Sequence, residues 1–104
     1  MADHQLVIQF PEDAFEDFDA LVSFEDSLYE LLDDRHEVDG HDIGSGEVNF
    51  FILTDDPRAA LAEIQARHGE RFSSPAVRAA TRRMHGEDYE VLWPGDDTTA
   101  FTIA

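Results

Sequence analysis

The sequence predicts a single α+β domain in which helices pack on one face of a β-sheet. Apolar, β-branched runs alternate with segments of helical hydrophobic spacing, in the order strand, helix, strand, strand, helix, strand. The short sequence Gly44-Ser45-Gly46 joins the two middle strands and is typical of a β-hairpin. A length of 104 residues, of which 42% are hydrophobic, suits one domain with one core. Together these observations predict a ferredoxin-like two-layer sandwich whose second sheet face is open.

The first strand and an acidic connector come from the start of the chain. Residues 6–10 are almost continuously apolar and are closed by Pro11, which predicts a central strand. Residues 12–19 are mostly acidic and contain Phe15 and Phe18. We expect both phenylalanines to pack against the body of the domain while the acidic side chains face water.

A helix and a hairpin follow this connector. Hydrophobic residues recur at helical spacing over residues 19–32, although Ser23 gives a second helix-start signal inside that range. Residues 37–43 and 47–54 predict two strands, and a turn centred on Ser45 connects them.

The second helix has clear start and stop signals. Asp55 or Asp56 supplies a cap, Pro57 occupies the first helical position and Gly69 ends the helix. The residues expected to form its buried stripe are Ala60, Leu61, Ile64 and Ala66.

The sequence leaves residues 75–85 open between a helix and a strand. Good helix formers follow a Ser-Pro start signal, but residues 89–93 alternate as a strand does. We favour a hairpin that pairs residues 77–82 with residues 89–93. Residues 100–103 are apolar enough to add a short C-terminal edge strand.

The charge of the chain is large, negative and unevenly distributed. The net charge is −17 without a single lysine, and residues 1–56 contain 17 of the 24 acids but only one arginine. Nucleic acid and anionic membranes are therefore poor partners, because both need a basic surface. The excess of acids is either a well-solvated surface or a face for a basic protein partner. The candidate partner face consists of Glu16, Asp17, Asp19, Glu25, Asp26 and Glu30.

Composition excludes several classes of protein. The chain has no cysteine, which excludes disulfide bonds, cysteine-ligated zinc and thiol catalysis. The first five residues are not those of a signal peptide, and the longest apolar run, residues 50–53, is far too short to cross a bilayer. We expect a cytoplasmic protein that needs no cofactor.

The predicted hairpin carries the densest group of polar residues. In an extended strand Glu37, Asp39 and His41 share one face. A turn centred on the serine of the glycine-rich sequence pairs His41 with Asn49, and Asp39 with Phe51. These five residues are the candidate binding site on the open sheet face.

Three interpretations of this group remain open. Glycine, aspartate and asparagine commonly hold tight turns through local hydrogen bonds, which explains most of the group structurally. A metal site would combine His41 with Asp39, Glu37 or Asp42, although one histidine among scattered carboxylates is a weak signal. A recognition surface on the open face is the third interpretation.

No catalytic group stands out, and we expect that the protein is not an enzyme. No serine lies in a nucleophile elbow, and no Ser-His-Asp set is recognisable. The histidines are more readily explained as exposed or capping residues than as catalytic bases. Arg78, Arg82 and Arg83 form a basic cluster that either pairs with the acidic front half or binds an anion or a partner.

Two stretches resemble a group of small, acidic bacterial proteins of uncharacterised activity. They are VDGHDIGSGEVNFFILTDDP at residues 38–57 and YEVLWP at residues 89–94. Members of the group share a Val-Asp-Gly-x-(Asp/Glu)-x-Gly-x-Gly-Glu hairpin and a Tyr/Phe-x-Val-Leu-Trp-Pro strand. The resemblance implies a strand over residues 89–93 and favours the hairpin before it, but it brings no activity with it.

The function expected from these observations is a non-enzymatic, acidic protein-binding module that engages a basic partner, similar to an immunity or inhibitor protein. The alternative is a regulatory domain that binds a small ligand or a metal on the open sheet face. Exposed Phe51 and Leu53 on that face also suggest a homodimer as a further alternative.

Overall fold

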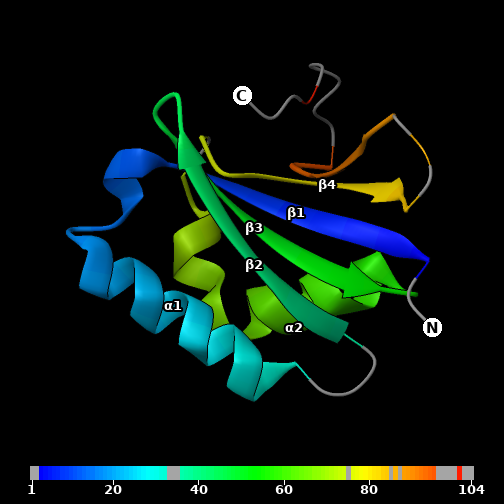
Figure 1. Cartoon of the computed structure of the whole chain (residues 1–104), viewed down its shortest axis with the longest axis horizontal. Helices are drawn as coiled ribbons and strands as arrows, with labels where there is room; N and C mark the ends of the chain where they lie inside the picture. The colour runs from blue at the N-terminus through cyan, green and yellow to red at the C-terminus, as the bar shows by residue number, and fades with distance from the viewer. Residues whose placement is uncertain are drawn as a thin grey trace.

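The computed structural model describes residues 3–32, 36–74, 76–84, 86, 88–95 and 101. A five-stranded antiparallel sheet has the strand order β2-β3-β1-β4-β5 (Figure 1). The elements are β1 (His4–Pro11), the short 3₁₀ helix η1 (Glu12–Ala14), α1 (Phe18–Leu31), β2 (His36–Gly44), β3 (Glu47–Thr54), α2 (Pro57–His68), the 3₁₀ helix η2 (Gly69–Phe72), β4 (Arg78–Arg83) and β5 (Glu90–Trp93). The predicted α+β class is confirmed, and the arrangement is compatible with a two-layer sandwich.

Both helices pack on the same face of the sheet. Alternate residues of β1 (Leu6, Ile8 and Phe10) point towards the helices and are almost completely buried. The helices contribute Leu21, Phe24, Leu28, Ala60, Leu61 and Ile64 to the same core. As predicted, β1 is central, because β3 and β4 flank it on its two sides (Figure 1).

Phenylalanine rings form the centre of this core. The ring of Phe10 lies 5.3 Å from Phe15, 5.3 Å from Phe24 and 5.8 Å from Phe50, each time edge to face. The cluster ties β1, the connector, α1 and β3 together.

Side-chain caps fix where the helices begin. The Asp17 carboxylate accepts a hydrogen bond from the Ala20 amide at 2.8 Å, so α1 begins at Phe18. Ser23 lies inside α1, and the second helix start considered there is wrong. Asp56 caps α2 through the Ala59 amide at 3.1 Å, as predicted.

One expected residue of the buried stripe of α2 is misplaced. Ala60, Leu61 and Ile64 are buried, but Ala66 is exposed. The buried positions follow the i, i+1, i+4 spacing of one helix face, and Ala66 falls outside that face.

The ambiguous segment is a strand, which confirms the favoured hairpin. β4 pairs antiparallel with both β1 and β5, and Ala79 and Ala80 turn to opposite faces of the sheet. The strand predicted over residues 100–103 lies outside the described residues except for Phe101. That ring is buried against Val7 and Ala80, on the face away from the helices.

The register of the β2–β3 hairpin differs from the prediction. The connection is a two-residue turn of Ser45 (φ 52°) and Gly46 (φ 80°), and Gly44 pairs with Glu47. A β-bulge also lies between Val38 and Gly40, where Gly40 has a φ of 116°.

This register separates the pairs expected from the sequence. His41 lies opposite Phe50 rather than Asn49, and Asn49 lies opposite Asp42. Asp39 is the extra residue of the bulge and does not lie opposite Phe51. Val38 and His41 therefore share the helix-covered face although they are three residues apart.

The face expected to be open is partly covered. Phe51 is half-buried and packs with the cluster that contains Val7, Ala80 and Phe101. Tyr89 also belongs to that cluster, with its ring 5.1 Å from Phe101.

The left-handed backbone of Gly46 predicts that an alanine there destabilises the protein more than an alanine at Gly69 does. Gly46→Ala forces a side chain into a positive φ and is expected to destabilise the protein by about 1 kcal/mol. Gly69→Ala is the matched control, because Gly69 has a right-handed helical φ of −51° and its added Cβ also meets nothing within 4 Å. Urea unfolding measures both, and an equal loss at the two positions contradicts the assigned turn.

Candidate functional site between α1 and β2

Three large hydrophobic side chains are strongly exposed in the described part of the chain. They are Phe18, Tyr29 and Ile43, which are 59%, 56% and 42% exposed. Phe18 and Tyr29 belong to α1, and Ile43 belongs to β2. Phe18 was expected to pack inside, and only Phe15 does so. Exposed aromatic residues in a small domain point to a contact surface.

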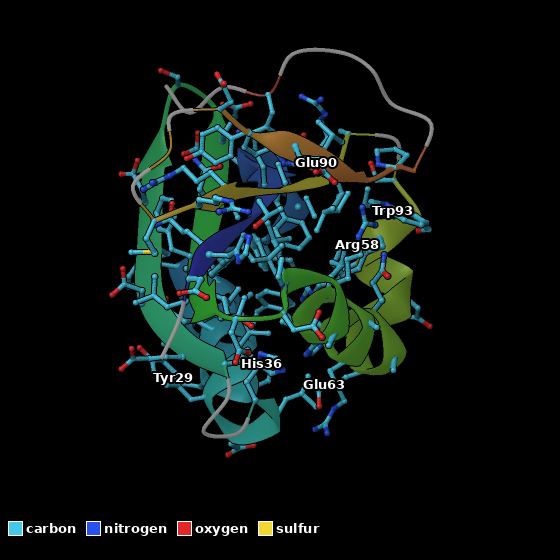
Figure 2. All side chains as sticks on the ribbon, turned by 90° about the vertical axis from the view of Figure 1, so that its right-hand side faces the viewer. Tyr29, His36, Arg58, Glu63, Glu90 and Trp93 are labelled. Atoms are coloured by element: carbon cyan, nitrogen blue, oxygen red, sulfur yellow. The ribbon has the colours of Figure 1, made fainter. Side chains whose placement is uncertain are left out.

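The two exposed aromatic residues of α1 lie on the flank that faces β2. Phe18, Glu25 and Tyr29 are seven and four residues apart, which places them on one side of the helix. Glu25 Oε2 lies 2.9 Å from Nδ1 of His41 on β2. The ring of Phe18 lies 6.3 Å from the same imidazole. Figure 2 shows Tyr29 at the margin of the molecule.

Ile43 extends this flank onto the strand. His41 and Ile43 pair with Phe50 and Val48, whose side chains belong to the core beneath the helices. Both side chains therefore point to the helix-covered side of β2. We call the surface formed by Phe18, Tyr29, His41 and Ile43 the α1–β2 surface.

Acidic side chains lie near the α1–β2 surface. Asp19, Asp26 and Glu30 are exposed on α1. On β2, Glu37 and Asp42 are exposed on the opposite face of the sheet, and Asp39 is exposed at the bulge. Neither element contains a lysine or an arginine. The surface therefore combines exposed apolar side chains with negatively charged neighbours.

The six residues of the predicted partner face have different roles. Glu16, Asp19, Asp26 and Glu30 are exposed. Asp17 caps α1, and Glu25 is largely buried against His41, so both have structural duties. The contact of Glu25 with His41 was not foreseen, because it depends on the two-residue turn, which pairs His41 with Phe50 and so directs it to the helix-covered face.

The structure does not bring the five residues of the predicted hairpin site together. Asn49 is buried, and its Oδ1 accepts a hydrogen bond from Gln9 Nε2 at 3.0 Å. This cross-strand pair explains why an asparagine occurs within an apolar strand. His41 points to the opposite face, away from Asn49, while Glu37 is exposed. The described residues contain no group of three or more histidine or acidic residues that could hold a metal ion.

Two of the three arginines in the basic cluster make contacts within the domain. Arg82 donates through Nε to Gln5 and through Nη1 to the carbonyl groups of Arg83, Met84 and Gly86, at 3.1 to 3.3 Å. Arg82 thus stabilises the β4–β5 connection through carbonyl oxygens, which corrects the pairing expected with the acidic front half. Arg78 lies over the ring of Phe101 at 5.2 Å, and Arg83 is exposed.

A buried polar chain joins β2, β3 and α2. His36 Nδ1 lies 2.7 Å from Thr54 Oγ1, and its Nε2 lies 3.0 Å from Glu63 Oε2 (Figure 2). The residue types resemble a catalytic relay, but Thr54 is fully buried and no substrate reaches its hydroxyl. We assign the contacts among His36, Thr54 and Glu63 a structural role. Sequence reasoning missed it because its members are 18 and 27 residues apart.

His68 forms a second contact between elements. Its Nε2 lies 2.8 Å from Ser27 Oγ, which itself donates to the Phe24 carbonyl at 2.6 Å. Because the single hydroxyl hydrogen of Ser27 is used there, the imidazole donates from Nε2. Burial, with help from Arg71 and Arg67, lowers the pKa of His68 below its ordinary value of 6.5.

A cavity of about 460 Å³ lies near the 3₁₀ helices, lined in part by Phe10, Asp13, Arg71 and Val77. The Arg71 guanidinium stacks over Phe15 at 4.7 Å and donates to the Ala14 carbonyl at 3.4 Å. These contacts give Arg71 a role in holding the connector.

No protein-family model, curated protein or solved structure matches the chain. Among the described residues no helix has the length and apolar character needed to cross a membrane.

Replacing Phe15 and Phe18 one at a time tests which of the two rings belongs to the core. Phe15→Ala removes a buried ring of the aromatic cluster and should destabilise the protein by about 3 to 5 kcal/mol. Phe18→Ala should change stability by at most about 0.5 kcal/mol, because the ring is mostly in water. Chemical denaturation of both variants tests this, and a large loss in Phe18→Ala contradicts its assignment to the surface.

The lowered pKa of His68 predicts a loss of stability in acid. Below pH 6.5 the unfolded chain binds a proton at His68 that the folded chain resists, so the free energy of unfolding falls as the pH falls through 6.5. The effect is complete below the folded pKa. His68→Gln keeps a donor for Ser27 and should flatten this part of the profile in thermal unfolding between pH 7.5 and 5. Parallel profiles for the two proteins argue against the assignment.

Proposed function

We propose that this chain is a non-enzymatic, acidic protein-binding module that engages a basic partner through the α1–β2 surface, in the manner of an immunity or inhibitor protein. The observation that carries the proposal is the position of Phe18, Tyr29 and Ile43, exposed on two adjacent elements that contain acids but no lysine or arginine. The expectation from charge and the exposed apolar side chains point to the same part of the fold.

The two kinds of residue have complementary roles in binding. Aromatic side chains at the centre of an interface commonly supply most of its affinity. The exposed acids Asp19, Asp26 and Glu30 would steer a basic partner and reject acidic ones. Binding is therefore expected to weaken with salt without disappearing.

We also infer that the fold is a ferredoxin-like sandwich extended by β5. The strand order β2-β3-β1-β4 and two helices on one face support this inference. It makes β2 an edge strand next to α1. A ligand site on the other sheet face is the weaker candidate, because Asn49 and Phe51 are engaged in internal contacts there.

Neutralising acids at the surface tests the proposal against a control of equal charge. In the triple variant Asp19→Asn, Asp26→Asn, Glu30→Gln the native partner should associate about tenfold more slowly at low salt. The control Asp3→Asn, Glu70→Gln, Asp88→Asn removes three exposed acids elsewhere and should retain most of the rate.

The partner is first isolated from the native host on the wild-type chain and identified. Its association rate with each variant is then measured at several salt concentrations. Equal effects of the two triple variants, or a rate that ignores salt, contradict the proposal. Self-association of the chain as the only stoichiometric complex also contradicts it.

A further inference from the structure

We propose that the basic partner docks as an added strand along the outer edge of β2, beside residues 40–44, and that its residues alternate between apolar and basic. This inference rests on the function proposed above and specifies the chemistry of the partner. It follows from the backbone of β2, from the side chains at its edge and from charge.

The backbone of β2 is available for pairing at this edge. β2 ends the sheet, and among the described strands only β3 pairs with it. Gly44 and Glu47 flank a two-residue turn, so they form a hydrogen-bonded pair, and such pairs recur at every second residue. Asp42 and Gly40 therefore direct their backbone groups to β3. His41 and Ile43 direct theirs outwards.

The side chains beside this edge differ between the two faces. On the helix-covered side an added strand would meet His41 and Ile43, with Phe18 next to His41. On the other side it would meet Asp42, which stands between Gly40 and Gly44. A Cβ built on either glycine meets nothing within 4 Å, so long basic side chains have room to reach the Asp42 carboxylate. Apolar residues fit the first side and Lys or Arg the second.

The bulge limits the length of the added strand. An edge strand exposes unpaired backbone groups, and proteins often interrupt such an edge with bulges and charges. Here the bulge lies at Asp39 and Gly40, towards the start of β2, and the pairing with β3 continues without a shift from Gly40 to Gly44. The edge thus accepts a short segment and resists extended pairing.

Charge selects a basic occupant over a second copy of the chain. Two copies paired edge to edge would bring their Asp39 and Asp42 side chains close together, at a net charge of −17 for each chain. A segment with positive charges on the Asp42 side removes this repulsion. Homodimer formation through β2 is therefore an outcome that contradicts the proposal.

Synthetic peptides test the predicted pattern on the full-length chain. The probe is a nine-residue peptide of alternating arginine and valine with blocked ends, and the comparisons are a glutamate–valine peptide and a peptide of the same composition with its arginines in one block. Calorimetry should give tightest binding for the alternating arginine peptide. Equal binding of the arginine and glutamate peptides overturns both this inference and the proposed function.

A proline at the edge tests strand addition alone. Ile43→Pro removes an outward N–H while the β2–β3 ladder stays intact, whereas Ile43→Ala shortens the side chain and keeps that donor. The alternating arginine peptide should bind Ile43→Pro about tenfold more weakly than Ile43→Ala, the loss expected from one backbone hydrogen bond. Equal binding by the two variants overturns strand addition and leaves the proposed function standing.

Backbone methylation of the peptide gives the same test without altering the protein. An added strand turns the amides of alternate residues towards β2, so methylating either all valine or all arginine amides should abolish binding, and methylating the other set should not. If both methylated peptides bind as well as the parent, the peptide uses side chains only and the inference is overturned. This comparison decides the case even if Ile43→Pro fails to fold.

Discussion

The two-residue turn at Ser45-Gly46 and the bulge at Asp39 decide on which face of the sheet each residue of β2 lies. Without the bulge, strand alternation would put His41 and Val38 on opposite faces. With it, both point towards the helices, where Val38 joins the core and His41 meets Glu25 of α1. The contact between α1 and β2, and the composition of the surface that they share, therefore depend on two backbone features with positive φ at Ser45, Gly46 and Gly40.

Contacts in the core hold α1 and the start of β2 in position against the rest of the sheet. Phe10 packs edge to face on Phe24 and Phe50, and the rings of Phe24 and Phe50 lie 5.0 Å apart at a tilt, so the three rings hold α1 against the sheet. The buried contacts of His36 with Thr54 and Glu63 fix the start of β2 to β3 and α2. Polar groups buried in this way are costly when unpaired, so they favour one arrangement of the three elements. A binding surface that is already formed before the partner arrives loses little entropy on binding.

Short-range patterns in the sequence predicted the strands and the helix start that depend on neighbouring residues. Apolar continuity identified β1 and β3, and Asp56 with Pro57 identified the start of α2. Three features were beyond such signals. A glycine on each side of Ser45 fits either a two-residue or a three-residue turn, and the choice shifts the register by one residue. Phe15 and Phe18 look equivalent in sequence, and only the packing around Phe10 separates them. The contacts of His36 and of Glu25 join residues distant in the chain, for which a single sequence carries no signal.

The register of the hairpin is measured most directly by nuclear Overhauser contacts between α-protons across β2 and β3. In an antiparallel ladder the non-hydrogen-bonded pairs bring their α-carbons to about 4.5 Å, which gives strong contacts. We expect such contacts between His41 and Phe50 and between Ile43 and Val48. A strong contact between the α-protons of His41 and Asn49 would contradict the register, and with it the α1–β2 surface.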